Sequence, residues 1–241
     1  MNKERLKNGL EKMGIAADET ALDRFEAFHA ILDEYNARMD LTAVLDEDER
    51  VDRHDLDSAA PLAHGLLMTG AKVIDVGTGA GFPGMPLAIA RPDLKVTLLD
   101  SQRKRCDFLS AVCDELQLPN VTVLHARAED GARGALREQM DVAAARAVAP
   151  LNVLAEYLLP YVRVGGRMLC WKGPAVREEM AAGERACRML GGQAEGLYRL
   201  PIEGREHYVH SAIKISATAR RYPRKSGMPS KDPLGILPQK P

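Results

Sequence analysis

Residues 73–84 decide the fold, and they read Val73-Ile74-Asp75-Val76-Gly77-Thr78-Gly79-Ala80-Gly81-Phe82-Pro83-Gly84. The first four predict a short apolar strand that carries one acid, and the glycines after them predict a tight turn. Glycine accepts positive φ and has no Cβ to keep a ligand away from the backbone. With a helix expected at 84–91, this order is typical of a nucleotide-cofactor site at the carboxyl edge of a parallel sheet. The plainer alternative is a turn that binds nothing.

Two classes of cofactor compete for this turn. The spacing Gly79-x-Gly81-x-x-Gly84 formally fits a dinucleotide, and Asp100 lies near the distance expected for a ribose-binding acid. Asp75, however, lies inside the strand, two residues before Gly77, where a carboxylate would repel a pyrophosphate. S-adenosylmethionine has no phosphate and carries a positive sulfonium and a positive amino group, which a carboxylate attracts. We therefore expect S-adenosylmethionine, with Asp100 accepting hydrogen bonds from the ribose, and keep a nicotinamide dehydrogenase as the weaker alternative.

The pattern beyond residue 71 alternates between strands and helices. Strands are expected at 71–76, 95–99, 121–125, 140–145 and 166–171, with helices at 84–91, 102–117, 150–163 and 175–190. This alternation predicts a doubly wound α/β fold with a mostly parallel sheet. Two more strand-like stretches, 193–201 and 207–216, have no helix between them and predict a terminal hairpin. The expected architecture is therefore a Rossmann-like S-adenosylmethionine-dependent methyltransferase fold: seven strands with one antiparallel edge strand.

The segments on either side of this core differ from it in pattern. A first helix should stop at Gly14, and Asp18 or Thr20 should cap a longer helix. Its apolar stripe (Leu22, Phe25, Phe28, Leu32, Tyr35 and Met39) is expected to pack on the core rather than on a partner. We divide the chain into an N-terminal helical extension (1–67), a methyltransferase core (68–217) and a basic, proline-rich, extended tail (218–241).

Composition limits the class of protein. The chain has 241 residues, of which 46% are hydrophobic and 28% charged, so it is expected to be a folded, soluble protein. The formal net charge is −1, so a nucleic acid would have to bind at local basic patches. Two basic clusters are candidates for phosphate contacts: Arg103, Lys104 and Arg105, and Arg220, Arg221, Arg224 and Lys225.

The cysteines and the hydropathy pattern bear on location and metals. Four cysteines show neither a C-x-x-C pair nor metal-ligand spacing, so we expect reduced thiols, no metal and a cytoplasmic protein. The sequence has no basic-then-apolar leader and no apolar run of membrane-spanning length, so neither a signal peptide nor a membrane span is expected. We expect a monomer.

The sequence resembles, over nearly its whole length, the bacterial 16S rRNA guanine-N7 methyltransferase family, also called the glucose-inhibited division protein B family. The matching stretches are 40–44, 53–58, 75–84, 98–101 with 104–105, 127–129, 146–147, 172–173 and 222–225. The resemblance implies 16S rRNA or the small ribosomal subunit as partner and a guanine of the 530 loop as substrate (nucleotide 527 in the usual rRNA numbering). The alternatives are a methyltransferase of this fold with another substrate and a non-catalytic ribosome-binding module.

The resemblance also implies roles for single residues. Gly77 and Phe82 would contact the cofactor, Ala128 and Glu129 would flank its adenine, and Arg146 would lie at the cofactor and the target base. Together with the motif residues Asp75, Gly79, Gly81 and Asp100, they form the expected cofactor site.

The expected substrate site is smaller. His54, with Asp57 and Ser58, is a candidate for the base pocket, although local bonds at a helix start explain these residues equally well. Lys172 is a candidate for a contact with rRNA, the alternative being a solvated strand end. For Trp171, core packing is favoured over stacking on a base.

The sequence departs from the family pattern at three places. Asp40 stands where asparagine is usual, and His207 stands where members tend to have arginine. His210 and Ser211 interrupt an otherwise apolar strand. Substrate contacts expected along that strand are therefore in question.

The chemistry expected at this site needs no proton transfer. N7 of guanine has a free lone pair and no proton to lose, so catalysis should come from aligning it with the methyl group. The fourth strand ends in Ala143-Ala144-Ala145-Arg146, without the Asn/Asp-Pro-Pro-aromatic signature of amine methylation, and no cysteine follows a proline. We therefore expect no catalytic acid, base or nucleophile.

Overall fold

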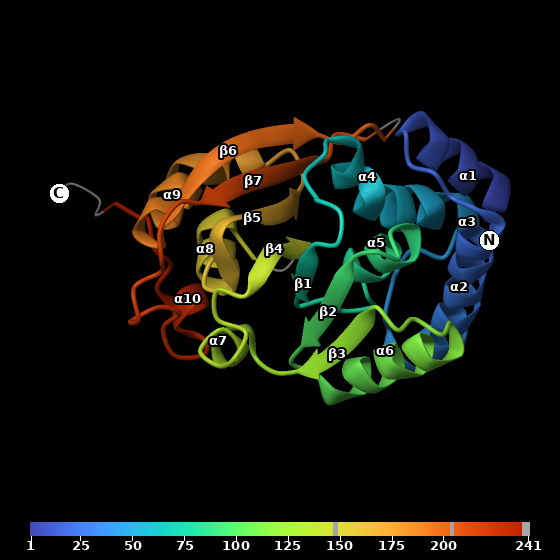
Figure 1. The fold of residues 1–241 in the computed structure, drawn as a ribbon, viewed down its shortest axis with the longest axis horizontal. Helices are drawn as coiled ribbons and strands as arrows, with labels where there is room; N and C mark the ends of the chain where they lie inside the picture. Colours follow the sequence, from blue (N-terminus) through green and yellow to red (C-terminus); the bar gives the residue numbers. More distant parts are fainter. Residues whose placement is uncertain (147–148, 203–204, 238–241) are drawn as a thin grey trace.

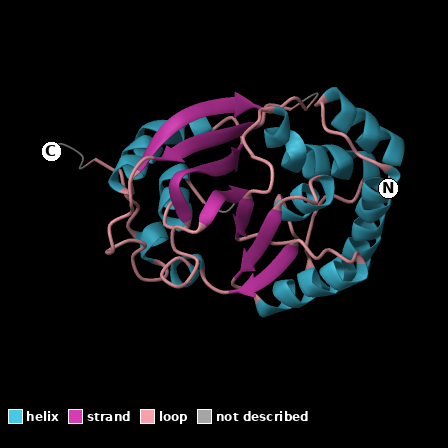
Figure 2. Ribbon diagram, in the orientation of Figure 1, coloured by secondary structure: helices cyan, strands magenta, loops and turns pink. Residues whose placement is uncertain are grey.

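The structure is a computed structural model that describes residues 1–146, 149–202 and 205–237. In these residues seven strands form one sheet in the order β3-β2-β1-β4-β5-β7-β6, with helices on both faces (Figures 1 and 2). The strands are β1 (Lys72–Val76), β2 (Lys95–Asp100), β3 (Val121–His125), β4 (Met140–Arg146), β5 (Val162–Lys172), β6 (Gly192–Arg199) and β7 (Tyr208–Lys214). Neighbours pair in parallel from β3 to β5, and β7 is antiparallel to both β5 and β6. The predicted fold class is confirmed.

The helices also follow the predicted order. They are α1 (Lys3–Lys12), α2 (Glu19–Met39), α3 (Glu47–Arg50), the π-helix η1 (Val51–Leu56), α4 (Asp57–Ala63), α5 (Gly84–Ala90), α6 (Arg103–Glu115), α7 (Ala128–Gly131), α8 (Leu151–Leu158), α9 (Val176–Met189) and α10 (Met228–Lys231). The helix predicted at 150–163 was too long. It ends at Leu158, with Leu159 as its C-cap, because Pro160 has no amide N–H to continue the helical hydrogen bonds, and β5 begins at Val162.

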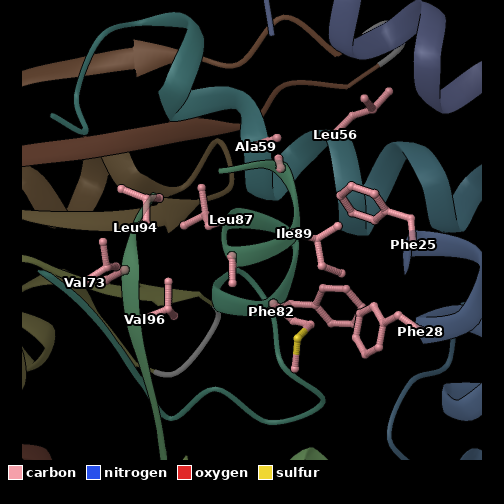
Figure 3. Packing of buried hydrophobic residues seen from close by; sticks show 14 of the residues in the cluster. Phe25, Phe28, Leu56, Ala59, Val73, Phe82, Leu87, Ile89, Leu94 and Val96 are labelled. Atoms are coloured by element: carbon pink, nitrogen blue, oxygen red, sulfur yellow. The ribbon is translucent and has the colours of Figure 1, made fainter. Parts of the chain in front are cut away.

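The N-terminal helices share a hydrophobic core with one face of the sheet. Asp18 caps α2 by accepting a 2.8 Å hydrogen bond from the Ala21 amide, and Gly14 ends the first segment with φ +71°. Phe25 and Phe28 of α2 point toward α5, where Phe28 packs on Phe82 with ring centroids 5.4 Å apart (Figure 3). The prediction that this stripe packs on the core is confirmed. The division of the chain at residue 67 stays a prediction.

The opposite face of the sheet has its own core. Leu154 and Leu158 of α8 and Cys187 of α9 pack there against Ile74 and Val76 of β1 in a second buried cluster. All four cysteines are free thiols, with Cys106, Cys170 and Cys187 buried and Cys113 partly buried. Among the described residues, no group of His, Cys, Asp or Glu is arranged to hold a metal, and no helix is long and apolar enough to cross a bilayer.

The C-terminal segment packs on the core more than the extended tail predicted from its composition. It runs beside α7 and α8 and contains the short helix α10 (Figure 1). Arg224, a candidate for a phosphate contact, is engaged within the protein: its guanidinium is held by the fully buried carboxylate of Glu156, 2.7 Å from Nη2, and by Asp232. Residues 238–241 of the tail and Ala147 of the family-like pair 146–147 lie outside the described residues.

Close packing at the start of α5 makes one glycine replaceable only at a cost. A Cβ on Gly84 would lie 2.3 Å from Leu98 Cδ2 and 3.0 Å from Asp75 Oδ2. We expect Gly84→Ala to lower the free energy of unfolding by about 1–3 kcal/mol, measured by urea denaturation. Gly173→Ala is the control, because a Cβ there meets no atom within 4 Å, and its effect should be within about 0.5 kcal/mol. Equal stability of the two variants would contradict this packing.

Candidate functional site

The glycine turn lies where the carboxyl ends of β1, β2 and β4 meet. Gly77, Gly79 and Gly81 have φ of +72°, +61° and +99°, the region that favours glycine. The amides of Gly77 and Thr78 donate to the Leu99 carbonyl of β2, at 2.8 and 3.1 Å. A Cβ on Gly79 would meet no protein atom within 4 Å, so the space beside the turn is open.

The side chain of Asp75 holds this turn by hydrogen bonds. Its Oδ2 accepts hydrogen bonds from the Thr78 hydroxyl at 2.7 Å and from the Gly84 amide at 2.9 Å. The residue is fully buried, and its Oδ1 has no hydrogen-bond partner among the described residues. Burial raises the pKa of Asp75 to about 6. A buried carboxylate oxygen without a hydrogen-bond partner is a candidate for contact with a cationic group of a ligand.

Asp100 is the second carboxylate of the turn. From the end of β2 its Oδ2 accepts from the Gly79 amide at 3.0 Å, and its Oδ1 accepts from the Gln102 amide at 2.8 Å. Arg105 lies 3.6 Å from the same Oδ2. Each carboxylate oxygen can accept a second hydrogen bond. Asp100 can therefore hold the turn and still accept from hydroxyl groups of a ligand.

A cavity of about 260 Å³ lies beside this turn. Gly77, Ala128 and Glu129 line it together, as expected for residues around one end of a cofactor. The rest of its lining is Val76, Leu99, Ser101, Ala126, Arg127, Tyr157, Gly227 and Ser230. The last three come from α8 and the C-terminal segment, and no motif in the sequence points to them.

Arg146, Phe82 and His54 form a compact cluster at the end of β4. The His54 and Phe82 rings stack with centroids 4.4 Å apart, and the Arg146 guanidinium lies 4.9 Å from the centre of the Phe82 ring. Arg146 Nη1 donates to Asp57 Oδ2 at 3.2 Å and to the Arg53 carbonyl at 3.0 Å. Phe82 itself is almost fully buried, so its ring supports the other two side chains from below.

His54 is neutral in this cluster. Burial, with the nearby charge of Arg146, lowers the pKa of His54 to about 3. His54 Nδ1 lies 3.3 Å from Arg146 Nη2, which can only donate, and 3.1 Å from the Arg53 carbonyl, which can only accept. His54 Nε2 lies 2.8 Å from the Thr42 hydroxyl, which can donate or accept. Thr42 is held in turn by Asn36, whose Oδ1 accepts from its amide at 2.9 Å.

The other candidates on these elements are more constrained than expected. Trp171 is buried and its Nε1 donates to the Asp57 carbonyl at 2.8 Å, which confirms core packing. Lys172 is not a solvated strand end: its Nζ donates to the Ala149 carbonyl at 3.0 Å and pairs with Glu179 at 2.7 Å. Ser58 is buried, with no hydrogen-bond partner for Oγ among the described residues.

The residues that depart from the family pattern lie in three different surroundings. Asp40 ends α2 with φ +49°, a conformation that aspartate and asparagine both tolerate. His207 Nδ1 lies 2.8 Å from Asp57 Oδ1, so Asp57 is contacted by both Arg146 and His207. His210 is buried without a hydrogen-bond partner in the described structure, and burial lowers its pKa to about 4.

The remaining basic residues lie on the surface. Arg103 and Lys104 are exposed at the start of α6, beside Asp100, and Arg220, Arg221 and Lys225 are exposed along the C-terminal segment. They remain candidates for phosphate contacts. Sequence reasoning missed Asn36, which holds the loop after its own helix, and Tyr157 and Ser230, which are 73 residues apart and linked by no spacing rule.

Comparisons with known proteins agree with this geometry. The family model described as rRNA small subunit methyltransferase G (GidB) matches residues 21–207. The ribosomal RNA small subunit methyltransferase G of Alkaliphilus oremlandii is 44% identical over 235 residues, which is 96% of this chain and 98% of its own length. The protein of the same name from Leuconostoc mesenteroides is 41% identical over 239 residues, 97% of this chain and 100% of its own.

Solved structures share the fold at low sequence identity. An S-adenosylmethionine-dependent methyltransferase from Aquifex aeolicus has a TM-score of 0.53 and 19% identity, covering 70% of this chain and 95% of its own. The protein MtNAS in complex with S-adenosylmethionine has a TM-score of 0.55 and 16% identity, covering 80% and 72%. With the family match over residues 21–207 and relatives above 40% identity along almost the whole chain, this protein belongs to the rRNA small subunit methyltransferase G family.

Proposed function

We propose that this rRNA small subunit methyltransferase uses S-adenosylmethionine to methylate N7 of a guanine in the 530 loop of 16S rRNA. The observation that carries the proposal is the juxtaposition of two features at one sheet edge. A glycine turn held by Asp75 and Asp100 lies at the ends of β1 and β2, and the Arg146 cluster lies at the end of the neighbouring β4. The first suits the methyl donor, and the second suits the target base.

The residues around the turn would hold the cofactor. Asp75 Oδ1, buried and unpartnered, suits the cationic amino group, and Asp100 suits the ribose hydroxyls. Gly77, Ala128 and Glu129 line the cavity in which the adenine would lie. Gly79 and Gly81 keep the backbone free of side chains beside the donor. When bound, S-adenosylmethionine supplies an electrophilic methyl group on a positive sulfur.

The chain's contribution to the reaction is alignment. N7 of guanine attacks the methyl carbon with its lone pair while the sulfur leaves with its bonding pair, so no proton moves. Holding the reacting atoms in line can supply about 7–11 kcal/mol of the barrier. The target base must first leave its stack to reach the donor, as bases do in enzymes that modify them.

Arg146 is the residue we assign to the target base. Its hydrogen bonds with Asp57 and the Arg53 carbonyl fix the plane of the guanidinium, which lies over the Phe82 ring. The Asp57 carboxylate offsets its charge, so the site does not repel a sulfonium as an isolated cation would. An arginine held in this way can donate to O6 of guanine and leave N7 free to react.

The proposed reaction has a direct test. Small ribosomal subunits from a strain that lacks this gene should be incubated with the protein and S-adenosylmethionine, treated with borohydride and aniline, and read by primer extension. We expect a strand break at one guanine of the 530 loop that depends on both additions. A break that is present without the protein, or methylation confined to another base, overturns the assignment.

The buried charge of Asp75 predicts a trade between stability and binding. The pKa of Asp75 is about 6 in the folded chain, against 3.8 ordinarily. The free energy of unfolding therefore falls as pH rises from about 4 to 6, and the whole loss is present above about pH 6. Asp75→Asn should therefore be more stable than the wild type by roughly 1–3 kcal/mol at about pH 7.5, and the gain should shrink toward pH 4. Its affinity for S-adenosylmethionine should fall at least about tenfold, because the amide has no charge to offer.

Urea denaturation at the two pH values and calorimetry with the cofactor measure these effects. Thr78 and Gly84 can still donate to the amide oxygen of the variant, so the turn should persist. Wild-type affinity in the variant would remove Asp75 from the cofactor site. A loss of stability that is the same at both pH values would contradict the raised pKa.

Arg146 can be tested against an arginine in a comparable ion pair elsewhere. We expect Arg146→Ala to lower kcat on small subunits by about 100-fold or more, because a fixed hydrogen-bond donor to the base is lost. Arg167→Ala is the control. Arg167 pairs with Glu195 at 2.8 Å and lies on β5 four residues before Trp171, the residue beside Arg146, so this variant should keep the kcat of the wild type. Near-equal kcat for the two variants, with the fold intact by circular dichroism, would exclude a role for Arg146 at the base.

A further inference from the structure

The C-terminal arm, residues 222–234, lies on the cofactor side of the molecule. Figure 1 shows α10 beside α7 and α8, across the sheet from the N-terminal helices. Gly227 and Ser230 of this arm line the same cavity as Gly77 and Ala128. A segment that follows the last strand thus forms part of a space bounded by the first.

Buried polar contacts fix the beginning of the arm. The Arg224 guanidinium donates to the Glu156 carboxylate through Nε at 3.0 Å and Nη2 at 2.7 Å, and its amide donates to the same carboxylate at 2.7 Å. Glu156 is fully buried on α8. Just before this pair, Arg137 donates to the Tyr222 carbonyl at 2.8 Å.

The end of the arm is fixed as well. Asn152 Nδ2 donates to the carbonyl of the buried Leu234 at 2.8 Å. Because both ends are attached to α8 or to the loop before β4, the intervening residues hold one position over the cavity. The arm is therefore fixed in position and forms a wall of the cavity, whereas its composition predicted an extended, irregular tail.

Two hydrogen bonds join the arm to the rim of the cavity. The Gly227 amide, at φ +82°, donates to Glu129 Oε1 at 2.7 Å. The hydroxyls of Tyr157 and Ser230 lie 2.8 Å apart. Glu129, which was expected to flank the adenine, is thereby committed in part to holding the arm.

We propose that the C-terminal arm forms the outer wall of the adenosine end of the cofactor pocket, where Ser230 and Tyr157 present hydroxyls to the purine. This rests on the proposed function. After their mutual bond, the two hydroxyls still have one O–H donor and free acceptor lone pairs. Adenine offers an acceptor at N1 and a donor at N6, so the pair complements its edge. Arg224 is a positioning residue in this arrangement and acts through the arm.

Calorimetry with S-adenosylhomocysteine, the stable product, tests the wall. Ser230→Phe should place a ring in the cavity and weaken binding at least about 50-fold, by exclusion of the purine. Lys231→Phe is the matched control, because Lys231 is exposed on the same helix and does not line the cavity, and it should bind within about twofold of the wild type. Equal binding by the two variants overturns the proposal.

Tyr157→Phe tests recognition separately from the shape of the pocket. A purine that lacks the 6-amino group loses one of the two hydrogen bonds, so the wild type should bind S-adenosylhomocysteine about tenfold more tightly than its analogue without that amino group. In Tyr157→Phe this ratio should fall severalfold, a change that mere loosening of the fold would not produce. An unchanged ratio overturns the assignment of the hydroxyls. If the wild type binds neither compound, the proposed function fails.

Discussion

The buried carboxylate of Asp75 is the constraint on which the site depends. One of its oxygens ties Thr78 and Gly84 together, and this fixes the shape of the turn and the start of α5. The other oxygen is buried and has no hydrogen-bond partner among the described residues. Buried polar atoms without partners are rare in stable folds, so this one calls for an explanation such as a ligand. The same residue thus costs stability at neutral pH and, under the proposed function, offers a carboxylate oxygen to the cationic part of the cofactor, while the close packing around Gly84 keeps it in place.

A second carboxylate, Asp57, connects parts of the chain that are far apart in sequence. Its side chain is contacted by Arg146 of β4 and by His207 before β7, while its carbonyl accepts from Trp171 of β5. The N-terminal helices are thereby joined to the catalytic edge of the sheet by polar contacts as well as by the core. This joint explains how helices outside the sheet can set the orientation of the arginine assigned to the target base.

Local patterns accounted for most of the fold. Apolar strands followed by helices at regular spacing specify a parallel sheet, and Asp18 caps α2 as its residue type predicts. The structure differs from these expectations once for a local reason and once for a long-range one. The end of α8 depends on Pro160, and Arg224 in a basic run is neutralised by Glu156, a residue 68 positions away on another element. A charge run looks solvated in sequence because its partner cannot be read from spacing.

The sequence by itself determined the glycine turn, its acid, the class of cofactor and the family, because these reside in one short stretch or in matches along the chain. Only the tertiary structure decided how Asp100 holds the turn, how Arg146 is paired with Asp57, and that Tyr157, Gly227 and Ser230 share a cavity with Gly77. The physical reason is the same in each case. Periodicity fixes which face of an element is buried, but hydrogen bonds and cavities depend on which elements the folded sheet brings together.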